Sequence, residues 1–302
     1  MRSLLSAVLT LSLLSWGAAP TSLQLGHIGI FLRCTGKTDP REALQAVRSL
    51  GLRMVQVSKL PDRFYSPEGA KEFAALLNET GVQASAVVAV YDGENYKDIP
   101  TIRATVGFVP KAFMDQRVAY TKKCVDLAAA LKVKIVTFHV GFLPAQPTDP
   151  DYQRLVHAVR DVAQYAAKHS VTISLETGQE SADELLQFLG QVAHRNVGVN
   201  FDMANLVLYG KDDAPAALRK LLPKVTSVHV KDGLQPEDPA RLGAEARLGE
   251  GKAGVKECLK MLKAAHFAGP VVIENYVFRG RGTEPMAELA LAKAFVDQAL
   301  AP

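Results

Sequence analysis

The sequence predicts a single (β/α)8 barrel, a TIM barrel, and three observations support this prediction. Eight short apolar segments alternate with amphipathic helical segments from about residue 24 to the end of the 302-residue chain. Strands separated by helices favour parallel pairing with right-handed crossovers, and eight such units match a closed barrel. An open doubly wound sheet is the alternative, but no G-x-G-x-x-G turn follows the first apolar segment. Since no linker or repeat divides the chain, we expect residues 23–302 to form one domain.

The predicted strands are short runs rich in Val, Ile and Phe, as expected for strands buried on both faces. They cover residues 25–32, 53–58, 84–90, 134–140, 171–176, 197–202, 225–230 and 270–274. Gly51 and Gly81 stand before the second and third of these runs, where each is expected to end a helix.

Several of the helices between these runs have a recognisable beginning. Asp39 is followed by Pro40 and Glu42, which supplies an N-cap, a proline in the first turn and an acid at the third position. Ser66 is expected to begin the second helix, and Ser181–Glu184 has the spacing of a capping box. These signals place helices directly after the strands, as the barrel requires.

The first residues have the pattern of a secretory signal peptide. Arg2 precedes the apolar run LLSAVLTLSLLSW at 4–16, and the small residues 17–19 follow it. The run is too short to anchor the chain in a bilayer. We therefore expect residues 1–22 to be a signal peptide and the mature protein to be exported, periplasmic or extracellular, with no stable membrane anchor. A buried first helix is the alternative.

The composition is that of an ordinary globular protein, with 48% hydrophobic and 22% charged residues and a net charge of +4. No block of five or six like charges occurs, so nucleic acid is not an expected partner, while an oligomer is compatible with this composition. The three cysteines, Cys34, Cys124 and Cys258, are odd in number and lack metal-site spacing, which argues against a disulfide framework. Cys124 and Cys258 lie in helical patterns and are expected in the core.

Five consecutive predicted strands end on a side chain that can bind a metal ion. These residues are His139, Glu176, Asp202, His229 and Glu274. In a (β/α)8 barrel the active site lies at the C-terminal ends of the strands, so all five would meet at one rim.

The alternation of side chains along a strand indicates which way these residues point. Each shares its strand face with a small or polar residue: His139 with Thr137, Glu176 with Ser174, Asp202 with Asn200, and His229 with Ser227. Bulky apolar residues occupy the opposite faces, which would meet the helices. The candidates are therefore expected to point into the mouth of the barrel.

Three carboxylates and an imidazole that meet in one place repel or desolvate one another unless a cation is present. Oxygen ligands with one histidine suit Mn²⁺, Mg²⁺, Co²⁺ or Zn²⁺. We therefore expect Glu176, Asp202, His229 and Glu274 to be metal ligands. The alternative is that Asp202 caps the next segment and His229 binds a backbone carbonyl.

Five motifs, in order along the chain, resemble those of the sugar isomerase/epimerase superfamily of xylose isomerase-like barrels. They are SLETG, NFDMANLVLYG, VHVKDG, the loop LGEG at 248–251, and VIENY. The resemblance implies a single divalent metal ion held by the same four residues. It also implies that Glu176 and Glu274 lie on either side of the substrate.

The implied activity is metal-dependent isomerisation or epimerisation. One glutamate removes a proton next to the carbonyl of a keto-sugar, the metal stabilises the resulting ene-diolate, and the same or the second glutamate returns the proton. Because export favours unphosphorylated compounds, the expected substrate is an unphosphorylated sugar, keto-sugar or inositol. A lyase or dehydratase with the same site and a non-catalytic carbohydrate-binding barrel are the alternatives.

Four further residues are expected to contact the substrate: His139, Asn205, Lys231 and Glu250. The alternatives are a structural histidine, a helix cap, a solvent-exposed lysine and an exposed loop acid, respectively. Endonuclease IV-type relatives have a histidine at the position of Asn205 and need several more, so DNA repair is a weaker interpretation. Gln56 stands where much of the family has an acid.

Overall fold

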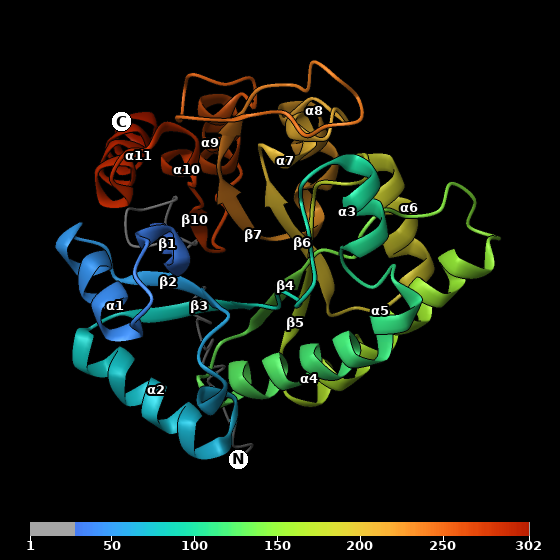
Figure 1. Ribbon diagram of the computed structural model, residues 1–302, viewed down its shortest axis with the longest axis horizontal. Coiled ribbons are helices and arrows are strands. Elements are labelled where there is room, and N and C mark those ends of the chain that lie inside the picture. Colours follow the sequence, from blue (N-terminus) through green and yellow to red (C-terminus); the bar gives the residue numbers. More distant parts are fainter. Residues whose placement is uncertain (1–27, 302) are drawn as a thin grey trace, which may run out of the picture.

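The computed structural model describes residues 28–301, which form a closed barrel of eight parallel strands (Figure 1). The strands are β1 (Ile28–Phe31), β2 (Met54–Ser58), β3 (Gln83–Val88), β4 (Ile135–Phe138), β5 (Thr172–Glu176), β6 (Val197–Asp202), β7 (Val225–Val230) and β10 (Val271–Ile273). Each pairs with its neighbours in chain order, and β10 closes the barrel against β1. The predicted fold class is confirmed. The predicted signal peptide lies outside the described residues.

Eight helices, one after each barrel strand, surround the barrel (Figure 1). They are α1 (Pro40–Ser49), α2 (Pro67–Thr80), α4 (Met114–Ala130), α5 (Pro150–Lys168), α6 (Ala182–Val192), α8 (Ala214–Leu221), α9 (Val255–Ala264) and α11 (Pro285–Leu300). Successive helices contact one another, and their apolar faces cover the outward-facing Val, Ile and Phe side chains of the strands.

The predicted helix starts are confirmed by their hydrogen bonds. The Asp39 side chain accepts from the backbone N–H of Glu42 at 3.0 Å. Ser181 and Glu184 form both hydrogen bonds of the capping box. Gly81 follows α2 with a φ of +65°, a conformation that favours glycine. Local sequence thus determines where these helices begin and end.

Shorter elements lie in the loops that follow the strands at the mouth of the barrel. They are the 3₁₀ helices η2 (Leu32–Thr35), η3 (Asp62–Tyr65) and η4 (Lys111–Phe113), the α-helices α3 (Ile99–Thr105), α7 (Asn205–Leu208) and α10 (Val277–Arg281), and the two-residue strands β8 (Asp232–Gly233) and β9 (Glu245–Ala246). A further 3₁₀ helix, η5 (Leu222–Lys224), ends the segment before β7. Residues of η2, α7, β9 and α10 line a cavity at this mouth.

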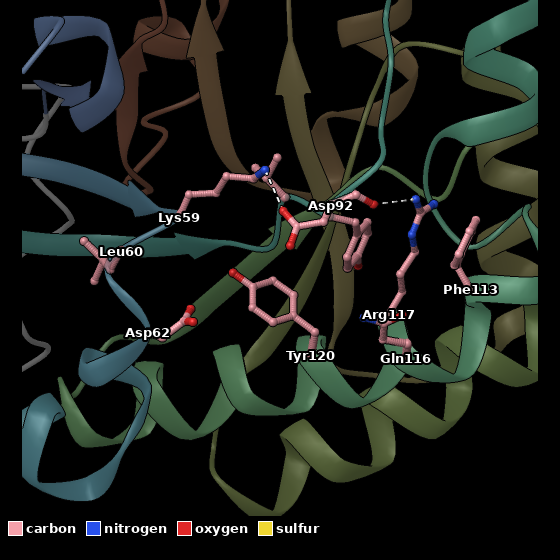
Figure 2. A pocket seen from close by; sticks show the side chains of 10 residues that line it. Lys59, Leu60, Asp62, Asp92, Phe113, Gln116, Arg117 and Tyr120 are labelled. Atoms are coloured by element: carbon pink, nitrogen blue, oxygen red, sulfur yellow. Dashed lines mark hydrogen bonds and ion pairs between the residues drawn. The ribbon is translucent and has the colours of Figure 1, made fainter. Parts of the chain in front are cut away.

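The long loop after β3 is held by a buried arginine on α4. The Arg117 guanidinium donates to the backbone carbonyl of Asp92 at 3.1 Å (Figure 2). It also donates to the carbonyls of Thr105 at 2.8 Å and Gly107 at 2.5 Å. Because these carbonyls lie on both sides of α3, one side chain fixes both ends of this part of the loop.

The cysteines are buried and free. Cys124 and Cys258 lie on α4 and α9, as predicted, whereas Cys34 lies in η2 beyond the end of β1. Burial raises the pKa of the Cys124 thiol to about 12, which makes it unreactive at neutral pH. Within residues 28–301 no helix is long and apolar enough to cross a membrane.

Candidate metal centre

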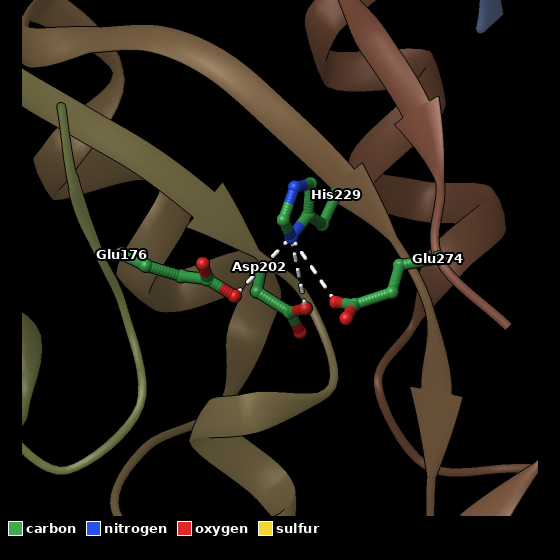
Figure 3. Close-up of side chains that lie close together, drawn as sticks. All are labelled: Glu176, Asp202, His229 and Glu274. Atoms are coloured by element: carbon green, nitrogen blue, oxygen red, sulfur yellow. Dashed lines mark hydrogen bonds and ion pairs between the residues drawn. The ribbon is translucent and has the colours of Figure 1, made fainter. Parts of the chain in front are cut away.

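Four side chains meet at the C-terminal ends of β5, β6, β7 and β10 (Figure 3). The Nδ1 atom of His229 lies 3.2 Å from Glu176 Oε1, 3.6 Å from Asp202 Oδ2 and 3.1 Å from Glu274 Oε2. One potential ligand atom from each residue lies within 4.8 Å of all the others. In the part of the chain that the structure describes, this is the one group of its kind, and it is the predicted set.

Strand register staggers these residues along the rim, since Glu176 is the partner of Asn200, two residues before Asp202. Asp202 and His229 are directly paired across β6 and β7, and Val272 is the partner of His229 on β10. Glu274 follows β10, and its backbone N–H donates to Val230 at 3.1 Å, which continues the ladder by one step. The sequence placed Glu274 at the end of the strand, and the structure places it one residue beyond.

Gln56 and Asn200 contact the other ring nitrogen of His229. Gln56 Oε1 lies 2.6 Å from His229 Nε2, and Asn200 Nδ2 lies 3.2 Å from it. A register shift between Val55 and Gln56 marks a bulge at this point of β2. Because a carbonyl oxygen only accepts, the short contact with Gln56 places a proton on Nε2, so Nδ1 is the ring nitrogen that a metal ion would bind.

Asp202 provides a test of whether this group fits a cation. Its side chain is 0% exposed. Oδ1 accepts from the backbone N–H groups of Ala204 and Asn205, at 2.9 Å and 2.8 Å. Oδ2 has no hydrogen-bond partner among the described residues, and burial raises the pKa of this carboxyl. A buried carboxylate oxygen without a donor is costly, and a divalent ion ligated there would satisfy it, so the residues fit a metal ion.

Lys231 is part of the site rather than an exposed lysine. Its Nζ lies 3.3 Å from Glu274 Oε2, 3.3 Å from Asn205 Oδ1 and 3.7 Å from Asp202 Oδ2. Burial lowers its pKa, but these carboxylates outweigh burial and hold the pKa well above its usual range. Burial also raises the pKa of Glu274, yet Lys231 and His229 bring it below its usual range.

A cavity of about 530 Å³ opens over these residues. The side chains of Glu176 and Glu274 reach it with 6% and 12% of their surface exposed. Asp202 lies behind them and does not line the cavity. Of the three carboxylates in the four-residue group, the two glutamates are therefore those that a bound molecule can touch.

His139 and Asn205 line the cavity, where a ligand can reach them, and both also contact Glu176. His139 Nε2 lies 3.5 Å from Glu176 Oε1, and His139 is not one of the four grouped ligands. Asn205 is the first residue of α7, and its Nδ2 donates to Glu176 Oε1 at 3.3 Å and to Thr177 O at 3.1 Å. Burial raises the pKa of Glu176, but His139 and His229 bring it below its usual range.

Glu250 does not join this site. Its side chain is 50% exposed and forms an ion pair with Arg281 at 2.7 Å, and it is not among the residues that line the cavity. The structure thus separates Glu250 from the other three predicted substrate contacts.

The reason for this separation is a buried acid that the sequence analysis missed. The Asp232 carboxylate accepts from four backbone N–H groups, those of Gly233, Gly249, Gly251 and Ala253, at 2.9 to 3.0 Å. A Cβ atom on Gly251 would lie 2.1 Å from Asp232 Oδ1, so glycine is needed there. The signal was the acid directly after Lys231, followed by the glycines of LGEG.

We expect Asp232→Ala to reduce the free energy of unfolding by about 3 kcal/mol, because it leaves several buried N–H groups without an acceptor. Denaturant unfolding followed by circular dichroism measures this change. The matched control is Asp238→Ala, which removes an exposed acid that accepts one N–H, from Ala240. An Asp232→Ala variant as stable as the control would contradict this role.

Two further carboxyl groups in the cavity come from loops and were also missed. Glu245 on β9 accepts from the backbone N–H of Tyr276 at 2.6 Å, and burial raises its pKa to about 7. Glu94 accepts from the backbone N–H groups of Gly107 at 3.0 Å and Tyr91 at 3.2 Å, and burial raises its pKa. No strand-end rule indicates such residues, because their position depends on the path of a long loop.

Together the fold and the site define a TIM barrel with a four-residue group, at the C-terminal ends of its strands, suited to a divalent metal ion. More specifically, the chain belongs to the xylose isomerase-like TIM barrel family, whose model matches residues 44–294. A comparison with curated proteins finds no match.

Solved structures of this fold resemble the chain over most of its length. A xylose isomerase domain protein from Planctomyces limnophilus is 36% identical, with a TM-score of 0.79 over 85% of this chain and 90% of that one. A xylose isomerase-like TIM barrel protein from Mycobacterium smegmatis, in complex with magnesium, is 20% identical, with a TM-score of 0.66 and coverage of 86% and 87%. D-psicose 3-epimerase from Clostridium cellulolyticum H10, solved with D-tagatose, is 19% identical, with a TM-score of 0.66 and coverage of 90% and 98%.

Proposed function

We propose that this protein is a metal-dependent isomerase or epimerase that acts on an unphosphorylated sugar, keto-sugar or inositol. The proposal rests chiefly on one observation. Glu176 and Glu274 contact the same nitrogen of His229 from opposite sides, and both reach the cavity. Family membership and the sugar epimerases among the structural neighbours support an enzyme of this kind.

The positions of the two glutamates suit proton transfer on either face of a substrate. Glu176 ends β5 and Glu274 follows β10, and β6 and β7 lie between these strands in the barrel. One carboxylate removes the proton next to the substrate carbonyl, and the other returns a proton to the opposite face, which gives epimerisation. Return to the adjacent carbon gives aldose–ketose isomerisation instead.

The remaining residues of the site hold these carboxylates and stabilise charge. A divalent ion held by Glu176, Asp202, His229 and Glu274 would supply Lewis-acid stabilisation of the negative charge that develops on the substrate oxygens. The Lys231 ammonium, 3.3 Å from Glu274, adds a fixed positive charge beside those oxygens. Asn205 and His139 orient Glu176 through the contacts described above.

Export is part of this proposal. The predicted signal peptide at residues 1–22 would take the protein to the periplasm or the extracellular space, where unphosphorylated sugars and inositols are the available substrates. The proposed partner is therefore a small carbohydrate, without nucleic acid.

Solvent exchange tests the proposal directly. The manganese-loaded protein is incubated in deuterated water with a panel of ketoses, aldoses, keto-glycosides and inositols, and proton NMR follows the α-carbon. We expect deuterium to enter the α-carbon of at least one compound and a stereoisomer or carbonyl isomer to accumulate. Loss of water from the product would instead identify the lyase alternative. No exchange with any compound, on protein that holds its metal, would contradict catalysis and favour a carbohydrate-binding barrel.

A further inference from the structure

A second hollow of about 740 Å³ adjoins the site cavity. The two linings have three residues in common: Arg33, Lys59 and Arg279. All three are cations, so the wall shared by the cavity and the hollow is positively charged.

These cations come from three neighbouring positions around the barrel. Arg33 lies in η2 after β1, Lys59 follows β2, and Arg279 lies in α10 after β10. Since β1 pairs with both β2 and β10, the three side chains occupy one sector of the mouth. We call Arg33, Lys59 and Arg279 the cationic wall.

The charges of the cationic wall are available to a ligand. Within residues 28–301 neither Arg33 nor Arg279 forms an ion pair. The Arg279 guanidinium lies over the Tyr276 ring, 4.1 Å from its centroid, which orients it and leaves its N–H edges free. Lys59 pairs at 3.0 Å with Asp92, whose side chain is 97% exposed (Figure 2). Such an exposed pair contributes little and exchanges readily for a ligand anion.

Two further features single out this wall. Lys59 has a φ of +45°, a left-handed conformation that is uncommon for a lysine; the other described non-glycine residues with positive φ follow helices, whereas Lys59 follows a strand. The hollow beyond the wall also contains Lys37 and a single carboxylate, Asp62, so cations dominate its lining. Glu245 lies nearby, since it accepts from the backbone N–H of Tyr276, over whose ring Arg279 lies, but among the described residues no ion pair joins Glu245 to the wall.

We propose that the substrate is an anionic sugar whose acid group binds the cationic wall while its reactive carbons lie between Glu176 and Glu274. This proposal rests on the proposed function, since it names the substrate class of the same site. A carboxylate, sulfate or phosphate has the geometry that the two arginine forks bind in bidentate fashion. Because the proposed export favours unphosphorylated compounds, we expect the acid group to be a carboxylate or a sulfate.

Matched sugars test the proposal by isothermal titration calorimetry on the manganese-loaded protein. The probes are D-galactose and D-glucose, each compared with its uronate, its 6-sulfate and its 6-phosphate. We expect at least one anionic form to bind about tenfold or more tightly than its neutral parent, with the preference reduced at high salt. Tightest binding of the phosphates would contradict the expected source of the charge. Equal binding of every matched pair, or no binding of any anionic form, would overturn the proposal.

Variants of the two arginines test whether the cationic wall causes the preference for anionic sugars. Arg33→Gln and Arg279→Gln are each expected to reduce the anionic preference by about threefold or more, and the double variant to abolish it. Arg103→Gln is the matched control, because Arg103 also lies over an aromatic ring, 4.1 Å from the centroid of Phe142, but lines neither cavity. An anionic preference that survives in the double variant would overturn the proposal.

Solvent exchange separates this proposal from the proposed function. If neutral sugars exchange their α-proton as well as anionic ones, the anionic-substrate proposal fails and the function stands. If anionic sugars bind preferentially but never exchange, the cationic wall stands as a binding site and the catalytic function fails.

Discussion

Asp202→Asn is expected to remove the divalent ion from the protein. Oδ2 of Asp202 accepts no hydrogen bond from the described residues, and an amide removes the negative charge that a cation would bind there. Mutation of a residue that only hydrogen-bonds to a metal ligand typically lowers metal affinity about 10–100-fold. Because Asp202 is itself a proposed ligand, we expect Asp202→Asn to lower the affinity at least about 100-fold. Mass spectrometry of the purified protein, after incubation with manganese, gives the metal content per chain.

The melting temperature, measured with and without manganese, is a second test of metal binding. Manganese is expected to raise the melting temperature of the wild type and to leave that of Asp202→Asn unchanged, because a ligand stabilises only a state that binds it. Without metal, the variant is expected to be about as stable as the wild type, since burial of the Asp202 carboxylate offsets its long contacts with His229 and Lys231, at 3.6 and 3.7 Å. Asp213→Asn is the control: Asp213 caps α8 away from the site, and asparagine caps equally well. Metal content equal to that of the wild type would contradict the four-ligand site.

The second large effect is expected from the two glutamates. Glu176→Gln and Glu274→Gln, each measured at saturating manganese, are expected to lower epimer or isomer formation by about 10²–10⁴-fold, the contribution of a positioned acid or base. Because the glutamates serve opposite faces, one variant is expected to retain deuterium exchange without inversion, while the other loses both. Product formation is followed by chromatography and exchange by NMR on the same samples.

Glu250→Gln is the matched control for this experiment, because it makes the same chemical change on a carboxylate outside the cavity. Its rates should equal those of the wild type. Wild-type rates in both active-site variants at full metal occupancy would contradict acid–base catalysis by these residues. A uniform loss that disappears as manganese is raised would instead show that the two side chains act only as ligands.

Much of the metal group was predictable from the sequence, because strands impose simple rules. The alternation of side chains placed Glu176, Asp202 and His229 on inward faces, and parallel pairing brought their strand ends to one rim. The same rules located the barrel strands, although the first predicted strand, 25–32, extends one residue past β1 into the 3₁₀ helix η2. Strand periodicity does not say at which residue a loop conformation begins.

The residues that sequence reasoning missed depend on contacts between distant segments. Gln56 reaches His229 through a bulge in β2, and a bulge leaves no pattern in a five-residue strand. Asp232 collects N–H groups from a loop that ends 21 residues later, at Ala253. That arrangement turns Glu250 toward Arg281, which is why a plausible loop acid lies outside the site. Such contacts follow from the folded path of the chain, which local patterns do not encode.

The pairing of β1 with β10 has a consequence for how the chain acquires its fold. Ile28 lies beside Val271, so the barrel closes only when the first and last strands of the described chain are both present. Contacts between residues so distant in sequence form slowly, because a long loop must close before any stabilisation is gained. During synthesis β1 therefore has no partner on this side until almost the whole chain has left the ribosome. Closure of the barrel is therefore expected to be among the last steps of folding.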